Sequence, residues 1–217
     1  SGHPFNPLAG PLRSPARGVY ETLGWNLPHW PQLQQGAQAL LSWYPVLRVT
    51  IFPDGREWIA GRPLPAELSH WQQQGICAWL APPQNRSLPT HKTGNYLLPW
   101  LAKQQAGDRG AQEAILCDPQ GHWLETSTGN LWGWQGGCWY TPPVTAQALP
   151  GIARDRLLSW LRQQGIKVKE RPWPGDWVQS LDFLAYSNCV MEVIPIHRVI
   201  CPWGQLTYKG MTSPAGN

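Results

Sequence analysis

The alternation of hydrophobic and polar residues predicts a chain of mixed helices and strands. Between Pro31 and Trp43, leucine and alanine recur at helical spacing, and Pro31 suits a first helical turn, so this stretch is expected to be an amphipathic helix. Residues 46–52 then alternate toward the turn at 53–55, and residues 57–60 follow it. This pattern is typical of a β-hairpin.

Later in the chain, short apolar runs between turn signals predict strands, and longer runs with helical spacing predict helices. The expected helices are 95–105 and 151–164, and the expected strands are 76–80, 114–117, 123–125, 131–134, 138–140, 168–170, 183–186 and 193–199. Hairpins mixed with interspersed helices favour an α+β fold over a doubly wound parallel sheet.

The length of the chain allows two unequal lobes. Its 217 residues can bury a real core, and the proline-rich stretch at 82–89 is the best boundary between lobes. We therefore expect a small N-terminal lobe over residues 1–85 and a larger lobe over residues 86–217. Residues 1–19 are rich in proline, glycine and arginine without periodicity, so they are expected to be irregular.

Composition argues against several classes of protein. Only 14% of the residues are charged, and the net charge of +4 is spread without a run of lysine or arginine. Nucleic-acid-binding proteins typically have clustered positive charge, so this pattern argues against that class. There is no apolar span of about 20 residues and no signal-peptide pattern, so we expect no membrane segment and a cytoplasmic protein. The five cysteines form no C-x-x-C pair and lack metal-ligand spacing, so they are expected to be reduced and to bind no metal.

Three features could serve one cofactor. Lys92 could supply an amine, which burial and nearby cations would make more nucleophilic, and Glu125 could supply a carboxylate at a strand end. Residues 151–153 begin a helix, whose free N–H groups attract phosphate. An amine, a carboxylate and a phosphate cradle would together suit pyridoxal 5'-phosphate (PLP). Taken singly, Lys92 is more simply explained as a solvated lysine, Glu125 as a surface glutamate and residues 151–153 as an ordinary helix start.

Four runs in a fixed order strengthen the PLP interpretation. They are His91-Lys92-Thr93-Gly94-Asn95-Tyr96-Leu97, Glu125-Thr126-Ser127-Thr128-Gly129-Asn130-Leu131, Leu149-Pro150-Gly151-Ile152-Ala153-Arg154-Asp155 and Ser187-Asn188-Cys189-Val190-Met191-Glu192-Val193-Ile194-Pro195. Over about residues 30–208 the chain resembles the class IV aminotransferase family, the PLP enzymes of fold type IV. Leu47-Arg48-Val49-Thr50-Ile51 and Tyr140-Thr141-Pro142 look most like the aminodeoxychorismate lyases of that family.

The resemblance implies a role for each candidate residue. Lys92 matches the lysine that bonds the cofactor covalently, and Glu125 matches the residue that faces the pyridine nitrogen. The further implied PLP contacts are Ile152, Ala153, Asn188, Cys189 and Arg13 around the phosphate, and Tyr96 near the cofactor hydroxyl. Arg48 and Thr128 are assigned to substrate binding.

The chain also departs from the family pattern. The family begins with a β-hairpin that has no match before residue 20, so the resemblance implies a truncated N-terminal lobe. Pro53 stands where lyase relatives have an arginine for a substrate carboxylate, so Arg48 or Arg56 would have to compensate. Ala153 replaces a frequent threonine and keeps only the backbone N–H.

The function expected from the resemblance is a lyase that converts 4-amino-4-deoxychorismate to 4-aminobenzoate and pyruvate. One alternative is a branched-chain or D-amino-acid transaminase of the same family, which would use the same residues. Another is a catalytically degenerate homologue that binds PLP without turnover. The implied partners are a small-molecule amino substrate and a second copy of the chain in a homodimer.

Overall fold

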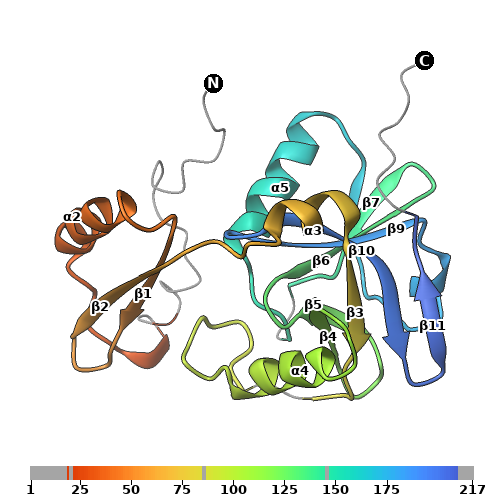
Figure 1. The fold of residues 1–217 in the computed structure, drawn as a ribbon, viewed down its shortest axis with the longest axis horizontal. Helices are drawn as coiled ribbons and strands as arrows, with labels where there is room; N and C mark the ends of the chain where they lie inside the picture. Colours follow the sequence, from red (N-terminus) through yellow and green to blue (C-terminus); the bar gives the residue numbers. More distant parts are fainter. Residues whose placement is uncertain (1–18, 20–21, 85–86, 145–146, 210–217) are drawn as a thin grey trace.

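The computed structural model describes residues 19, 22–84, 87–144 and 147–209. They form a small lobe and a larger lobe, as Figure 1 shows. The small lobe contains α2 (Trp30–Leu41), β1 (Val46–Ile51) and β2 (Glu57–Arg62). The helix begins where the His29 imidazole accepts a hydrogen bond from the Gln32 N–H, at 3.3 Å, and the two strands pair antiparallel beside it.

The larger lobe is built on a nine-stranded sheet whose strands run in the order β5-β4-β3-β10-β9-β6-β7-β8, with β11 paired to β10. Its strands are β3 (Ile76–Leu80), β4 (Glu113–Cys117), β5 (Trp123–Thr126), β6 (Asn130–Gln135), β7 (Cys138–Thr141), β8 (Val168–Glu170), β9 (Phe183–Asn188), β10 (Glu192–Cys201) and β11 (Gly204–Thr207). Parallel and antiparallel pairs occur together in this sheet. The predicted α+β class with two lobes is confirmed.

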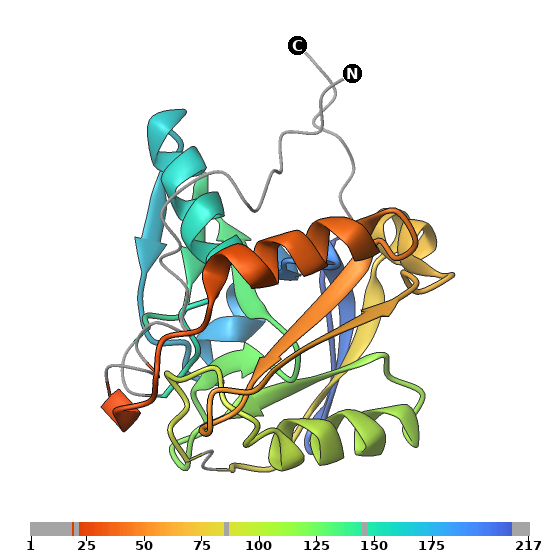
Figure 2. The ribbon, with the colours of Figure 1, turned by 90° about the vertical axis from the view of Figure 1, so that its left-hand side faces the viewer.

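The remaining elements are α3 (Leu68–Gln74), α4 (Leu97–Gly107), α5 (Ile152–Gln163) and a 3-10 helix at Trp177–Ser180. Helix α4 packs against β4, α3 against β10, and α5 against β8 and β9. Figure 2 looks onto the small lobe, with α4 along the lower side and α5 on the upper side of the molecule. The helices therefore cover different parts of the sheet.

The boundary between the lobes lies earlier in the chain than residue 85. Strand β3 was expected in the N-terminal lobe, but it pairs in parallel with both β4 and β10 in the middle of the large sheet. All five of its residues are buried. Both sheet neighbours of β3 belong to the larger lobe, and α3 packs against β10 of the same lobe, so the change of lobe falls between the end of β2 and the start of α3.

A buried ion pair fixes α5 to the sheet. The side chain of Arg154 is only 3% exposed, and its guanidinium lies 2.7 Å from the Glu170 carboxylate at the end of β8. Arg162 lies about two turns further along α5 and donates to the other oxygen of Glu170 at 2.9 Å. Burial alone would raise the pKa of Glu170, but its bonds to these two arginines hold the pKa below its ordinary value.

The longest helices among the described residues, α2 and α5, have 12 residues each. No described helix is both long enough and apolar enough to cross a bilayer.

Candidate active site

A cleft of about 1040 Å³ lies between the small lobe and the larger sheet. It brings together all the predicted site residues that the structure describes. They are Arg48, Lys92, Tyr96, Glu125, Thr128, Ile152, Ala153, Asn188 and Cys189. Arg13 lies outside the described residues, so the predicted phosphate arginine stays a prediction.

Lys92 lies in the loop that leads into α4. The neighbouring His91 holds this loop, since its Nε2 lies 3.1 Å from the Thr22 hydroxyl and its Nδ1 lies 3.0 Å from the Thr90 hydroxyl. The Lys92 amine lies 6.0 Å from the centre of the Tyr96 ring. The side chain of Lys92 is exposed in the open cleft, so the expected burial is not observed. The amine can therefore be reached by a molecule that enters the cleft.

Glu125 extends from β5 into the cleft and is 6% exposed. Its Oε2 accepts a hydrogen bond from the backbone N–H of Leu149 at 3.0 Å. This bond ties the carboxylate to the segment that precedes α5. A carboxylate held in this way keeps a fixed direction, because buried acceptors bonded to backbone donors lose most of their freedom to rotate.

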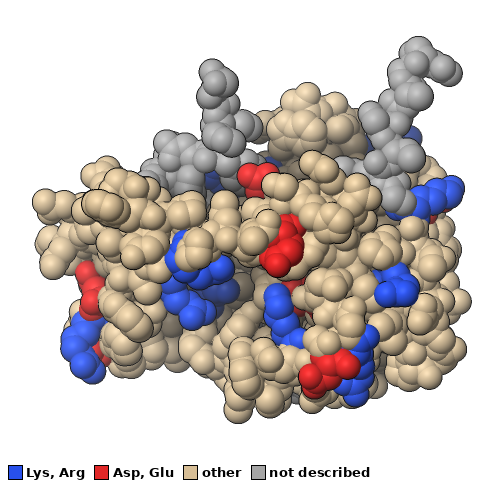
Figure 3. All heavy atoms as spheres, in the orientation of Figure 1, with Lys and Arg blue, Asp and Glu red and all other residues tan. Residues whose placement is uncertain are grey.

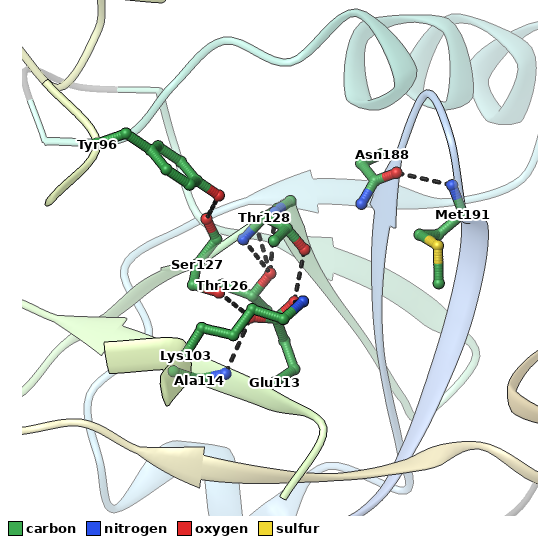
Figure 4. Close-up of polar contacts among 10 residues, drawn as sticks. Tyr96, Lys103, Glu113, Ala114, Thr126, Ser127, Thr128, Asn188 and Met191 are labelled. Atoms are coloured by element: carbon green, nitrogen blue, oxygen red, sulfur yellow. Dashed lines mark hydrogen bonds and ion pairs between the residues drawn. The ribbon is translucent and has the colours of Figure 1, made fainter. Parts of the chain in front are cut away.

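Beneath this part of the cleft lies a second carboxylate, Glu113, which is fully buried (Figure 4). It accepts hydrogen bonds from the hydroxyl of Ser127, from the hydroxyl of Thr128 at 2.5 Å and from the Ala114 N–H at 2.9 Å. The Lys103 amine lies 3.4 Å from its Oε2. Four donors thus satisfy one buried charge, as a carboxylate removed from water requires.

The same network reaches Tyr96 and Tyr186. The Tyr96 hydroxyl donates to the carbonyl of Ser127 at 2.5 Å, so the Lys92 loop and the Ser127 turn are joined directly. Burial raises the pKa of Tyr186, and the nearby Glu113 carboxylate raises it further. The Tyr186 phenol therefore stays neutral. Glycine is required at 129 in this turn, because a side chain there would collide with the carbonyl of Ser187.

The N-terminus of α5 forms another wall of the cleft. Gly151, Ile152 and Ala153 line the cleft, and the N-cap residue Gly151 provides no capping side chain for the first N–H groups of the helix. The Asn130 amide donates to the carbonyl of Leu149 at 2.8 Å and holds the preceding segment against β6. Uncapped N–H groups together with the helix dipole form an anion site.

The turn between β9 and β10 lies beside this helix end. The Oδ1 of Asn188 accepts a hydrogen bond from the N–H of Met191 at 2.8 Å (Figure 4) and another from the N–H of Val190 at 2.9 Å. Asn188 therefore shapes the turn that presents Cys189. The thiol of Cys189 is exposed, unlike those of the other four cysteines, which are buried.

The predicted substrate residues differ in what they contact. Arg48 lines the cleft from β1, whereas Arg56 lies in the β1–β2 turn and bonds Asp54 at 2.7 Å, outside the lining of the cleft. Arg48 is thus the better placed of the two arginines. The hydroxyl of Thr128 is used by Glu113, so its role toward a substrate stays a prediction.

Sequence reasoning missed Glu113, Lys103 and Arg62. Glu113 had a signal, because a carboxylate opens an otherwise apolar strand, and such a residue is buried only with partners. Lys103 lies on α4 ten residues before Glu113, and nothing local links the two. Arg62 closes β2 and lines the cleft, but its direction follows from the pairing of the hairpin.

Curated relatives match parts of the chain. The branched-chain-amino-acid aminotransferase of Escherichia coli K12 is 32% identical over 133 residues, covering 58% of this chain and 43% of that protein. The enzyme of the same name from Pseudomonas aeruginosa is 37% identical over 106 residues, covering 49% of this chain and 34% of its own length. The chain therefore spans less than half the length of these two relatives.

Solved structures share the fold. The branched-chain aminotransferase of E. coli superposes with a TM-score of 0.70 at 23% identity, covering 88% of this chain and 70% of its own. A protein provisionally named as a 4-amino-4-deoxychorismate lyase gives 0.71 at 25% identity, covering 83% of this chain and 74% of its own. A second with that provisional name, from Legionella pneumophila, gives 0.60 at 22% identity, covering 71% and 55%.

The family model for amino-transferase class IV matches residues 30–199, well over half of the chain. This range includes every described residue of the predicted site. PLP is the cofactor of that family. The expected resemblance is confirmed, and the chain belongs to the class IV aminotransferases.

Proposed function

We propose that the cleft binds PLP and places the amine-bearing carbon of a small amino substrate beside Lys92. One observation carries this proposal. An accessible amine, a fixed buried carboxylate and an uncapped helix N-terminus, from segments far apart in the sequence, open into the same cleft.

The donor groups fit the cofactor. The amine of Lys92 suits its aldehyde, the Glu125 carboxylate suits a protonated pyridine nitrogen, and the first N–H groups of α5 suit its phosphate. Ile152 and Ala153 would contribute those N–H groups, and the turn at Asn188 and Cys189 would add to them. A cleft of about 1040 Å³ has room for a cofactor and a small substrate.

When bound, PLP supplies an electron sink for a bond broken at the amine-bearing carbon. Lys92 would take the proton from that carbon, since its amine is the accessible base in the loop above the Ser127 turn. Glu125 would keep its charge directed at the pyridine nitrogen, because the Leu149 N–H holds it. Arg48 would bind a substrate carboxylate from the small-lobe side, where its guanidinium suits a planar anion.

The reaction that we propose is the cleavage of 4-amino-4-deoxychorismate. Lys92 would move the proton from the amine-bearing carbon to the enolpyruvyl methylene, the C–O bond to the ring would break, and the ring would become aromatic. The products, 4-aminobenzoate and pyruvate, contain all atoms of the substrate, so no second reactant is needed. The lyase-like motifs and the two solved neighbours provisionally named as such lyases support this reaction.

Transamination of a branched-chain or D-amino acid is the second candidate. The branched-chain-amino-acid aminotransferases among the curated relatives favour it. It would use the same lysine and glutamate but would need a keto acid to accept the amino group. A homologue that binds PLP without turnover is the third candidate, and Pro53, which stands where lyase relatives have an arginine, motivates it.

Borohydride reduction of the protein with PLP, followed by peptide mass mapping, tests the cofactor assignment. We expect one phosphopyridoxyl adduct, on Lys92, and none there in Lys92→Ala. Lys103→Ala is the matched control, because Lys103 also lines the cleft but is engaged by Glu113. An adduct spread over surface lysines would contradict the proposed site.

Product analysis then separates the three candidates. Release of 4-aminobenzoate and pyruvate from aminodeoxychorismate without a keto acid identifies the lyase. Keto-acid-dependent loss of the amino group identifies the transaminase, and a Lys92 adduct with neither reaction identifies the degenerate homologue. The homodimer remains a prediction, which sedimentation velocity at several concentrations would test.

A further inference from the structure

Two arginines lie next to each other on the small-lobe side of the cleft. Arg48 is in β1, Arg62 is the last residue of β2, and both line the cleft. In the hairpin, Arg48 is paired with Ala60 and Arg62 with Val46, so the two arginines are diagonal neighbours on one face. Diagonal neighbours of this kind have Cα atoms about 7–8 Å apart.

Neither guanidinium has a hydrogen bond or ion pair to another residue in the described part of the chain. Other arginines are engaged. Arg154 and Arg162 share a glutamate, and Arg56 bonds an aspartate in its own turn. Two like charges on one face of neighbouring strands repel each other, and an anion bound between them would relieve that repulsion.

The charged residues that line the cleft are mostly basic. They are Arg48, Arg62, Lys92, Lys103 and Glu125. Figure 3 shows basic side chains on both sides of the hollow between the lobes. A cleft walled by one sign of charge concentrates ions of the opposite sign. Lys103 is paired with Glu113, at 3.4 Å. Among the described lining residues, Arg48 and Arg62 are the positively charged ones that belong to the small lobe.

We propose that Arg62 binds a second carboxylate of the substrate, while Arg48 binds the carboxylate nearer the reacting carbon. The substrate class is then an amino compound with two acidic groups. Two planar guanidinium groups can hold two carboxylates in a fixed orientation, since each can form a two-bond pair. A substrate with an aliphatic side chain would leave Arg62 without a partner, which gives selectivity against it.

The inference deepens the proposed function, because it names the substrate class of the same cleft. It also distinguishes two of the candidate amino substrates. Aminodeoxychorismate carries two carboxylates, whereas a branched-chain amino acid carries one. Arg62 is therefore a specificity-determining residue that the family resemblance alone did not assign to this chain.

Isothermal titration calorimetry with glutarate and pentanoate tests the site. The two acids have chains of equal length and differ in the second carboxylate. For the full chain with PLP, we expect glutarate to bind about ten- to a hundredfold more tightly, the gain typical of a hydrogen-bonded charge pair. Arg62→Gln should lose this preference and leave the affinity for pentanoate unchanged.

Two further variants make the test specific. Arg56→Gln removes an arginine of the same lobe outside the cleft lining, so it should keep the preference. Arg62→Lys keeps the charge but loses the two-bond geometry, so its preference should lie between those of the wild type and Arg62→Gln. An equal loss in Arg56→Gln, or an undiminished preference in Arg62→Gln, would overturn the inference.

The same titration without PLP, alongside the borohydride experiment, separates this inference from the proposed function. A Lys92 adduct together with equal binding of the two acids would keep the cofactor assignment and overturn the role of Arg62. A glutarate preference that depends on Arg62, without a Lys92 adduct, would support the dicarboxylate site and remove the PLP assignment.

Discussion

Glutamine in place of Glu113 tests how the base of the cleft is held. The amide has nearly the same size as the carboxylate, but it is neutral and presents a donor where one acceptor oxygen was. The hydroxyls of Ser127 and Thr128 both donate to Glu113 in the native chain. At least one of these bonds must therefore reverse or break in Glu113→Gln.

The expected cost follows from the bonds lost. A hydrogen bond to a charged acceptor contributes about 1.5–3 kcal/mol and a neutral one about 0.5–1.5 kcal/mol. Over the two hydroxyl donors, the substitution should lower the free energy of unfolding by about 2 kcal/mol. Lys103 adds less than about 1 kcal/mol, because its side chain is 42% exposed and water screens the pair. Glu113→Ala also leaves a cavity and unmet donors, so about 4 kcal/mol is expected.

Urea unfolding followed by tryptophan fluorescence measures these differences. Trp123, Trp132 and Trp173 are almost completely buried in the larger lobe and report on its unfolding. Glu67→Gln is the control, since Glu67 is exposed and its side chain does not cap α3. A surface change of this kind should stay within about 0.5 kcal/mol of the wild type.

Equal stability of Glu113→Gln and the Glu67→Gln control would show that the two hydroxyl donors contribute nothing through the charge of Glu113. An equal loss of stability in Glu113→Gln and Glu113→Ala would show that shape, rather than hydrogen bonding, determines the effect. Equal m-values in all variants are needed for the comparison, since a change in m would indicate an altered unfolded or native state.

Three further predictions concern pH, thiol reactivity and packing. The pKa of Glu170 is lowered below 4.5 in the folded state, so its stabilising contribution is complete above pH 4.5 and is lost as the pH falls through the folded pKa. In Glu170→Gln, the free energy of unfolding should therefore change less with pH over that acidic range. At pH 8, iodoacetamide should modify exposed Cys189 well before Cys117, whose pKa burial raises to about 11, and bound PLP should slow only the first reaction; equal rates in a mass-mapped time course would contradict this. Gly129→Ala should lower the free energy of unfolding by about 2 kcal/mol through overpacking, whereas Gly107→Ala, with open space around it, should not destabilise the chain.

Much of the fold could be predicted because the pattern of each element is local. The helix that became α5 showed an apolar face, and the strand that became β3 showed an apolar run between turn signals. The elements that were missed lacked such signals. Helix α3 has seven residues, none of them buried, and β11 has four residues, of which three are exposed.

Pairing over long distances could not be predicted from a local pattern. Nothing near β3 in the sequence indicates that it lies beside β10. This pairing places β3 in the larger lobe, although the strand precedes the expected boundary at residue 85. For the site, the motif order placed Lys92 and Glu125 in one cleft. The support beneath them was missed, because a buried glutamate such as Glu113 becomes meaningful only when its donors from α4 and the Ser127 turn are brought close.

The central position of β3 has a consequence for synthesis on the ribosome. Its partner β4 follows within 40 residues, but its other neighbour, β10, begins only at residue 192. Ribosomes synthesise about 5–20 residues per second, so one hydrogen-bonding edge of the apolar strand β3 stays unpaired for roughly ten seconds before β10 has been made. Nascent chains and truncated products that end before β10 therefore carry an open edge, which must be shielded or will pair with other chains.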